Sequence, residues 1–241
     1  MNTPEARALI DETLAHPRST ARLAAAKEIA LRDPERAVDA MIREYTRTLE
    51  PDEELIGCLI GSGRLRAVQA IAKDLRKRLS STRFAVVHVL MRGGLPPSWV
   101  GFPEETALKA SPAYIAAVEQ LLVSLLMDKT VISSSMSIGS EAGMISFNHP
   151  EIGELAAYAL GESLPVKYKY VQRSSPSQSH LQAMRFTNLW RNERSMALLA
   201  EPKRPKTARV SPAIFDPLLR RALHGSPSER KEALARIKAL G

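Results

Sequence analysis

The chain has 241 residues, of which 44% are hydrophobic, 25% are charged and only 5% are aromatic. This composition excludes wholesale disorder, and abundant Ala and Leu with few aromatic residues favour packed helices over a β-sandwich. The formal net charge of +8 attracts nucleic acid, acidic proteins or anionic membrane surfaces, without specifying any of them.

Two further features bear on the compartment. The stretch 1–7 lacks the basic and apolar regions of a signal peptide, and the longest apolar stretch, 114–127, contains Glu119 and is too short to span a bilayer. The lone Cys58 lies in an apolar run, which is typical of a small buried hydrophobe and gives no disulfide framework. We therefore expect a cytoplasmic protein without membrane insertion.

Six short helices are expected in the first hundred residues, because apolar residues recur there at helical spacing between helix-starting and helix-stopping residues. Helices this short cannot bury their apolar faces alone, so neighbouring helices must stack. Their expected positions are a helix from Thr3 to about His16, one capped by Ser19 or Thr20, one from Pro34, one from Pro51, one over 63–79 and one over 82–91, before a glycine stop.

The rest of the chain is expected to be helical around one irregular insert. A turn-rich joint at 95–102 precedes an apolar helix, and 130–147 has the β-branched and glycine-rich pattern of a hairpin, although an ordered loop fits as well. The alternating stretch 166–171 is a candidate third strand. The expected helices are 112–127, 150–161, 177–199, 211–223 and 226–240, with a basic, Pro-containing linker at 201–210.

Three segments share small residues in the middle of a helix, which lets a second helix approach closely. They are 22–29, 152–161 and 230–237. These segments resemble the second helix of HEAT repeats, including the variant in phycobilisome-lyase-type repeats. Arg22 and Arg230 stand where such repeats often carry an Arg that bonds to a neighbouring repeat, whereas Gly153 departs from that pattern. The resemblance covers about a third of the chain, and a non-repetitive helical bundle remains the alternative.

The fold class that follows is mainly α, a HEAT-like α-solenoid of stacked helix pairs with a small β-hairpin insert near 130–148. The expected organisation is an N-terminal repeat region at 1–94, a central region at 95–200 and a C-terminal linker with a helix pair at 201–241. No known catalytic, cofactor-binding or metal-binding motif occurs, so we expect no cofactor and no metal site.

Basic clusters are the candidate binding sites for a nucleic acid or another anion. Arg76, Lys77 and Arg78 end the expected fifth helix, where the helix dipole alone also favours cations. Lys167-Tyr168-Lys169-Tyr170 with Arg173 interleaves cations and aromatic rings, as suits backbone contact and base stacking, but equally an edge strand. Lys203 and Arg204 lie in the linker.

Three functions are compatible with this pattern. The first is a non-enzymatic macromolecular binding or adaptor protein whose solenoid surface engages another protein or a nucleic acid. The second is a nucleic-acid-binding enzyme related to the HEAT-like DNA glycosylases, whose catalytic Asp has no identifiable counterpart in this chain. The third is a structural protein that assembles through the apolar helix at 112–127. The sequence does not specify the oligomeric state.

Overall fold

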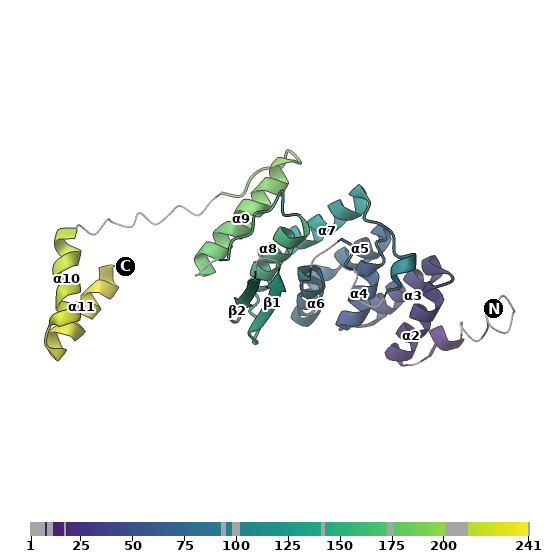
Figure 1. Ribbon diagram of the computed structural model, residues 1–241, viewed down its shortest axis with the longest axis horizontal. Coiled ribbons are helices and arrows are strands. Elements are labelled where there is room, and N and C mark those ends of the chain that lie inside the picture. The colour runs from purple at the N-terminus through teal and green to yellow at the C-terminus, as the bar shows by residue number, and fades with distance from the viewer. Residues whose placement is uncertain are drawn as a thin grey trace. The chain divides into compact units, whose positions relative to one another are not determined.

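The computed structural model describes residues 8, 12–16, 18–92, 95–97, 102–140, 143–172, 176–200 and 212–240. They form a mainly helical protein with one two-stranded antiparallel sheet, as expected from the sequence (Figure 1). The chain divides into two compact units, residues 1–199 and residues 200–241. Within the described part of the chain, the helices lack the length and apolar character needed to cross a membrane.

The first unit holds eight of the helices described and the sheet. Its elements are α2 (Ser19–Ala30), α3 (Pro34–Arg47), α4 (Glu53–Gly61), α5 (Leu65–Ala72), the 3-10 turn η1 (Leu75–Lys77), α6 (Ser80–Met91), the 3-10 turn η2 (Glu104–Thr106), α7 (Pro112–Leu125), β1 (Met136–Ser140), β2 (Gly143–Phe147), α8 (Ile152–Ser163) and α9 (Pro176–Asn192). The second unit holds α10 (Pro212–His224) and α11 (Pro227–Leu240).

Side-chain caps set several of these helix starts. Asp33 accepts a hydrogen bond from the Arg36 N–H at 3.1 Å, and Asp52 accepts one from the Leu55 N–H at 2.8 Å, which confirms the expected starts of α3 and α4. The start of α2 differs from the prediction. Arg18 occupies its N-cap position without a side-chain cap, and the two hydroxyl residues expected to cap it lie inside the helix.

The helices of the first unit form two rows. In one row α3, α5 and α7 pack in succession, and in the other α4, α6 and α8 do so, while consecutive helices such as α2 and α3 or α7 and α8 also pack together (Figure 1). Arg22 of α2 forms a two-pronged ion pair with Glu44 of α3, with N–O distances of 2.5 and 2.6 Å, so it joins α2 to the helix that follows it. Cys58 is fully buried in α4, as expected, and burial raises the pKa of its thiol to about 12.

The expected helix over 63–79 is wrong in its second half. Helix α5 ends at Ala72, and the backbone of Asp74 leaves the helical region at φ −131° and ψ 3° before the 3-10 turn begins. Tertiary contacts explain the break, because the Tyr45 hydroxyl donates to Asp74 at 3.4 Å and Arg78 binds both Asp74 and the end of α3. A continuous helix would rotate these groups away from α3.

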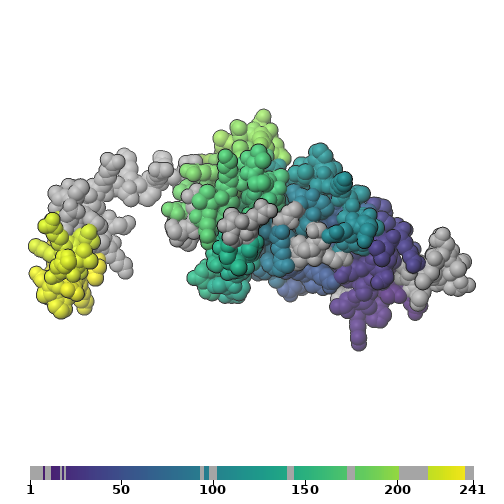
Figure 2. All heavy atoms as spheres, in the orientation of Figure 1, coloured from purple at the N-terminus to yellow at the C-terminus, as the bar shows by residue number. Residues whose placement is uncertain are grey.

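The hairpin is confirmed, with Ile138 opposite Ile145 and Met136 opposite Phe147, and it projects from the lower edge of the first unit (Figures 1 and 2). The expected third strand is wrong: 166–171 is not a strand. It runs back along α8, where the ring of Tyr170 meets that of Tyr158 edge to face at 5.3 Å.

Helix α9 then runs in the same direction as α8. Near the two helix starts, Ser179 of α9 donates to Glu154 of α8 at 3.2 Å. The helix expected to reach 199 ends at Asn192, because Ser195 adopts a left-handed φ of 51° and the Asn188 side chain bonds both backbone polar groups of Leu199.

Helix α7 is an interior element. Tyr114, Val118, Leu121, Leu122 and Leu125 are all buried, and the Tyr114 hydroxyl donates to the Ile60 carbonyl at 2.8 Å. Its apolar residues therefore serve the core of this unit, and the hypothesis that this helix is an assembly surface is wrong.

Candidate anion-binding groove

An open groove of about 350 Å³ lies where the start of α6 meets the end of α7. Two cations, one carboxylate and three smaller or apolar side chains line it. They are Arg76, Arg83, Ser124, Leu125, Met127 and Asp128. We call this set the basic groove.

An ion pair joins the two sides of the groove. The Arg83 Nε atom lies 2.7 Å from an Asp128 oxygen, and Arg83 also donates to the Thr130 hydroxyl at 3.1 Å. Burial alone would raise the pKa of Asp128, but hydrogen bonds from Thr130 and Arg83, together with the Arg83 charge, outweigh burial and hold this pKa below its usual value. Asp128 therefore stays ionised and holds Arg83 in place, and the remaining cations set the charge of the groove.

Four exposed cations belong to this region of the unit. Lys73, Arg76 and Lys77 follow one another over the end of α5 and the turn η1, and Lys129 directly follows the groove residue Asp128. None of the four forms an ion pair with a residue that the structure describes. Such cations keep their charge for an external anion, and Arg76 itself lines the groove.

Arg78 does not belong to this set. Its guanidinium pairs with Asp74 at 2.8 Å, donates to the Tyr45 carbonyl at 3.1 Å and to the Thr48 carbonyl, and lies 4.6 Å from the centre of the Tyr45 ring. Only 9% of the side chain is exposed. Arg78 therefore joins the loop to α3, which corrects its prediction as an anion-contacting residue.

The predicted stacking platform at 167–170 is also corrected. Tyr168 is fully buried and donates its hydroxyl to Glu119 at 2.6 Å, so its ring offers no face to a base. Lys167 forms ion pairs with Glu119 and Glu193, so its charge is already neutralised within the protein and is not available to an external anion. Tyr170 packs against Tyr158.

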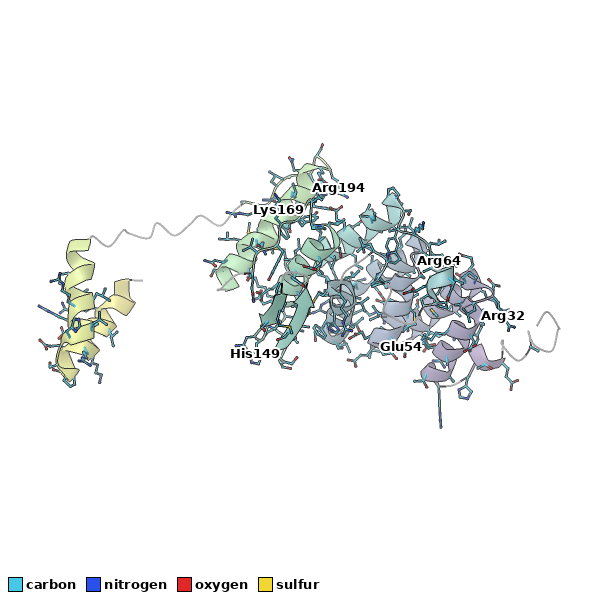
Figure 3. All side chains as sticks on the ribbon, viewed as in Figure 1. Arg32, Glu54, Arg64, His149, Lys169 and Arg194 are labelled. Carbon is cyan, nitrogen blue, oxygen red and sulfur yellow. The ribbon has the colours of Figure 1, made fainter. Side chains whose placement is uncertain are left out.

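The other predicted residues are dispersed. Lys169 is exposed in the connection between α8 and α9, and Figure 3 labels it in the same part of the unit as Arg194. Arg173, Lys203 and Arg204 lie outside the described residues. Of the ten predicted site residues, the structure brings Arg76 and Lys77 to the groove region.

Sequence reasoning missed Lys129 and Asp128 as site residues. Lys129 is a single cation some fifty residues from Lys77, and no local pattern distinguishes it from any other surface lysine. The pairing of Arg83 with Asp128 depends on the packing of α6 beside the end of α7, which only the tertiary structure provides.

The chain was compared with known families and proteins. No family model, curated protein or solved structure matches it. The HEAT-like resemblance accordingly stays a prediction.

Proposed function

We propose that this chain is a non-enzymatic macromolecular binding or adaptor protein, built as a HEAT-like α-solenoid, whose basic groove contacts an anionic partner. The observation that carries the proposal is the open groove lined by Arg76, together with the exposed cations at 73, 77 and 129, which form no ion pair with a residue that the structure describes. A stack of this kind presents an extended surface, which suits a macromolecule better than a small substrate.

The chemistry of the basic groove fits an anion that remains partly hydrated. Arg76 supplies a planar guanidinium for phosphate or carboxylate, and the flanking lysines supply point charges. The groove is open and shallow, and Met127 adds an apolar contact that is 39% exposed. These features support backbone contact along a polyanion without a deep, base-specific pocket.

The experiment is fluorescence anisotropy with labelled single- and double-stranded DNA and RNA, and with polyglutamate, across a salt series. Four phosphate contacts predict a log–log slope of affinity against salt of about −3 to −4 on duplex DNA. The double variant Arg76→Glu/Lys77→Glu is expected to weaken binding at least about tenfold, because each reversal replaces an attraction with a repulsion.

The matched control carries the same change of net charge elsewhere. Arg32 and Lys109 are exposed cations in other connections, and Arg32 is labelled in Figure 3. Arg32→Glu/Lys109→Glu is expected to change binding by less than about twofold, since these residues do not line the groove. Equal losses in both variants, or no binding to any of the polyanions at low salt, would overturn the proposal.

The glycosylase hypothesis gains no observation of its own. Asp128 is the carboxylate in the groove, and Arg83 and Thr130 already engage it. Release of alkylated bases from DNA, measured beside the binding series, tests that activity directly. Base release that is lost in Asp128→Asn would replace the adaptor proposal with the enzyme.

A further inference from the structure

The second compact unit is a helical hairpin. Helices α10 and α11 are joined by two residues, and at the start of α11 the Glu229 carboxylate accepts from the Ser226 N–H at 2.8 Å and from its hydroxyl at 2.7 Å. The two helices meet through two alanines and one leucine: Ala233 is buried, and Leu218 and Ala222 are half-buried. These positions define the inner side of each helix.

One face of this hairpin is apolar. Leu219 and Leu223 of α10 are 41% and 59% exposed, and Leu234 of α11 is 57% exposed. Each leucine directly follows an inner residue of its own helix, and one residue along an α-helix turns the side chain by about 100° around the axis. All three leucines are therefore rotated in the same sense away from the contact between the helices. Because the helices are antiparallel, displacements in the same sense point to the same side of the hairpin. The three leucines therefore form one face, which we call the docking face.

The opposite face is polar. Arg221, Glu232 and Arg236 lie there around a small depression, and Arg236 pairs with Glu232 at 2.9 Å. The hairpin is thus amphipathic across its width.

Cations rim the docking face. Arg220 lies three positions before Leu223, and Arg230 and Lys231 lie four and three positions before Leu234, spacings that make them surface neighbours of those leucines. All three are exposed. By the same spacing Asp216 lies three positions before Leu219, so the spacing gives this face three cations and one carboxylate, while Glu229 and Glu232 lie towards the opposite side.

Size adds a second reason for a partner. The hairpin runs from 212 to 240, and helical segments this short usually need a disulfide, a metal or association with other structure to be stable. The chain's one cysteine is in α4, so this hairpin has no disulfide, and Ala233 is its one buried hydrophobic residue among the described side chains. A third helix laid over the docking face would cover its leucines and complete a three-helix unit.

We propose that the docking face binds an acidic amphipathic helix of a partner protein. Such a helix places apolar residues on the three leucines and carboxylates against Arg220, Arg230 and Lys231. A second copy of the hairpin fits less well, because a symmetric dimer sets the same face against itself and so brings cations near cations. This inference does not depend on the basic groove.

The test uses the full chain and a fluorescent synthetic peptide. The peptide has three heptads with Leu at the a and d positions and Glu and Gln elsewhere. A scrambled peptide of the same composition and charge, in which the leucines no longer share a face, is the control. We expect micromolar binding of the heptad peptide and at least about tenfold weaker binding of the scrambled one.

Variants locate the contact. Leu219→Ser/Leu223→Ser and Arg220→Glu/Lys231→Glu are each expected to weaken peptide binding at least about tenfold, since one removes apolar contact and the other reverses the rim charge. Arg32→Glu/Lys109→Glu, which changes the net charge equally outside both sites, is expected to leave it unchanged, and Arg76→Glu/Lys77→Glu reports any binding of this acidic peptide to the basic groove. Circular dichroism checks that each variant keeps its helix content.

Five results would overturn the proposal. Equal binding of both peptides would reduce the contact to charge alone, and a loss confined to the groove variant would move it to the other unit. Failure of the heptad peptide to bind the full chain would count equally against an acidic helix. A dimer that dissociates on Leu219→Ser/Leu223→Ser, or binding of phosphatidylserine-containing vesicles without peptide binding, would assign the face to a second copy or to lipid.

Discussion

Glu119 is the residue on which the end of the first unit depends. Its buried carboxylate accepts a hydrogen bond from the Tyr168 hydroxyl at 2.6 Å and pairs with Lys167 at 2.5 Å and Arg194 at 3.2 Å. It therefore joins α7 to the segment that follows α8 and to the segment that follows α9. Glu119→Gln removes the negative charge with which Lys167 and Arg194 form ion pairs. We expect a loss of about 2–4 kcal/mol in the free energy of unfolding, measured by urea denaturation.

The matched control is Glu193→Gln, which removes another carboxylate that contacts Lys167 but is 44% exposed. Exposed pairs contribute little, so its expected cost is below about 1 kcal/mol. Equal costs for the two variants would contradict the role assigned to Glu119.

Glu119 also predicts a pH dependence. Burial alone would raise its pKa, but hydrogen bonds from Lys167 and Tyr168 and the charges of Lys167 and Arg194 outweigh burial and lower the pKa. A lowered pKa in the folded state gives stability that is present above the unfolded value of about 4.3 and is lost as the pH falls through the folded value. The stability difference between wild type and Glu119→Gln should therefore shrink below about pH 4. A difference that stays constant down to pH 3 would exclude this linkage.

Gly153 shows why α8 carries a glycine where the HEAT-like pattern has none. A Cβ atom there would lie 2.3 Å from the Leu126 carbonyl oxygen, and the Gly153 N–H donates to the Asp128 carbonyl at 2.9 Å. Gly153→Ala must push the end of α7 away, and we expect a loss of at least about 2 kcal/mol despite the better helix propensity of Ala. Gly139→Ala, where nothing lies within 4 Å, is the control and should cost less than about 0.5 kcal/mol in the same denaturation assay.

At the scale of the element, the loop after α5 contains two adjacent cations with different roles: Arg78 stabilises the fold, and Lys77 is available for binding. Arg78 is 9% exposed and bonds to the end of α3, whereas Lys77 is exposed and pairs with no residue that the structure describes. Arg78→Met is expected to lower the free energy of unfolding by about 2–3 kcal/mol, and Lys77→Met to leave it within about 0.5 kcal/mol. In the anisotropy assay Lys77→Met should weaken polyanion binding. The reverse pattern would contradict both assignments.

Local signals predicted the elements whose boundaries depend on local chemistry. The starts of α3 and α4, where Asp33 and Asp52 cap the helices, and the β-hairpin could be predicted from the sequence, because each depends on residues a few positions apart. Among the errors, the helix over 63–79 and the strand over 166–171 lie where distant partners decide the backbone. Tyr168 alternates with cations as an edge strand would, but Glu119, 49 residues away, draws it into the core.

The same distinction explains the candidate site. A run such as Arg76 to Arg78 is visible in the sequence as charge, yet the direction in which each side chain points depends on the turn that ends α5. The groove itself needs the end of α7 beside α6, a contact between segments some 45 residues apart. The sequence therefore predicts that this region is basic, and only packing shows which cations remain available.

At the scale of the whole molecule, the two compact units differ in how much core each can bury. In the first unit, α4, α6 and α8 contribute fully buried residues such as Ile56, Val87 and Leu155. In the second, Ala233 is the buried hydrophobic residue among the described side chains, and Leu219, Leu223 and Leu234 face solvent. Local stability follows local apolar burial, so the two units should open with very different free energies.

Hydrogen exchange of the full chain measures this difference. Amides of α10 and α11 are expected to exchange at least about a hundred times faster than those of α6 and α8, after correction for intrinsic rates. Adding the acidic heptad peptide should slow exchange in α10 and α11 alone, because a partner that binds the folded hairpin stabilises it by mass action. Exchange in α10 and α11 as slow as in α6 without any peptide would mean that the hairpin is already stable by itself, and the argument from its size would fail.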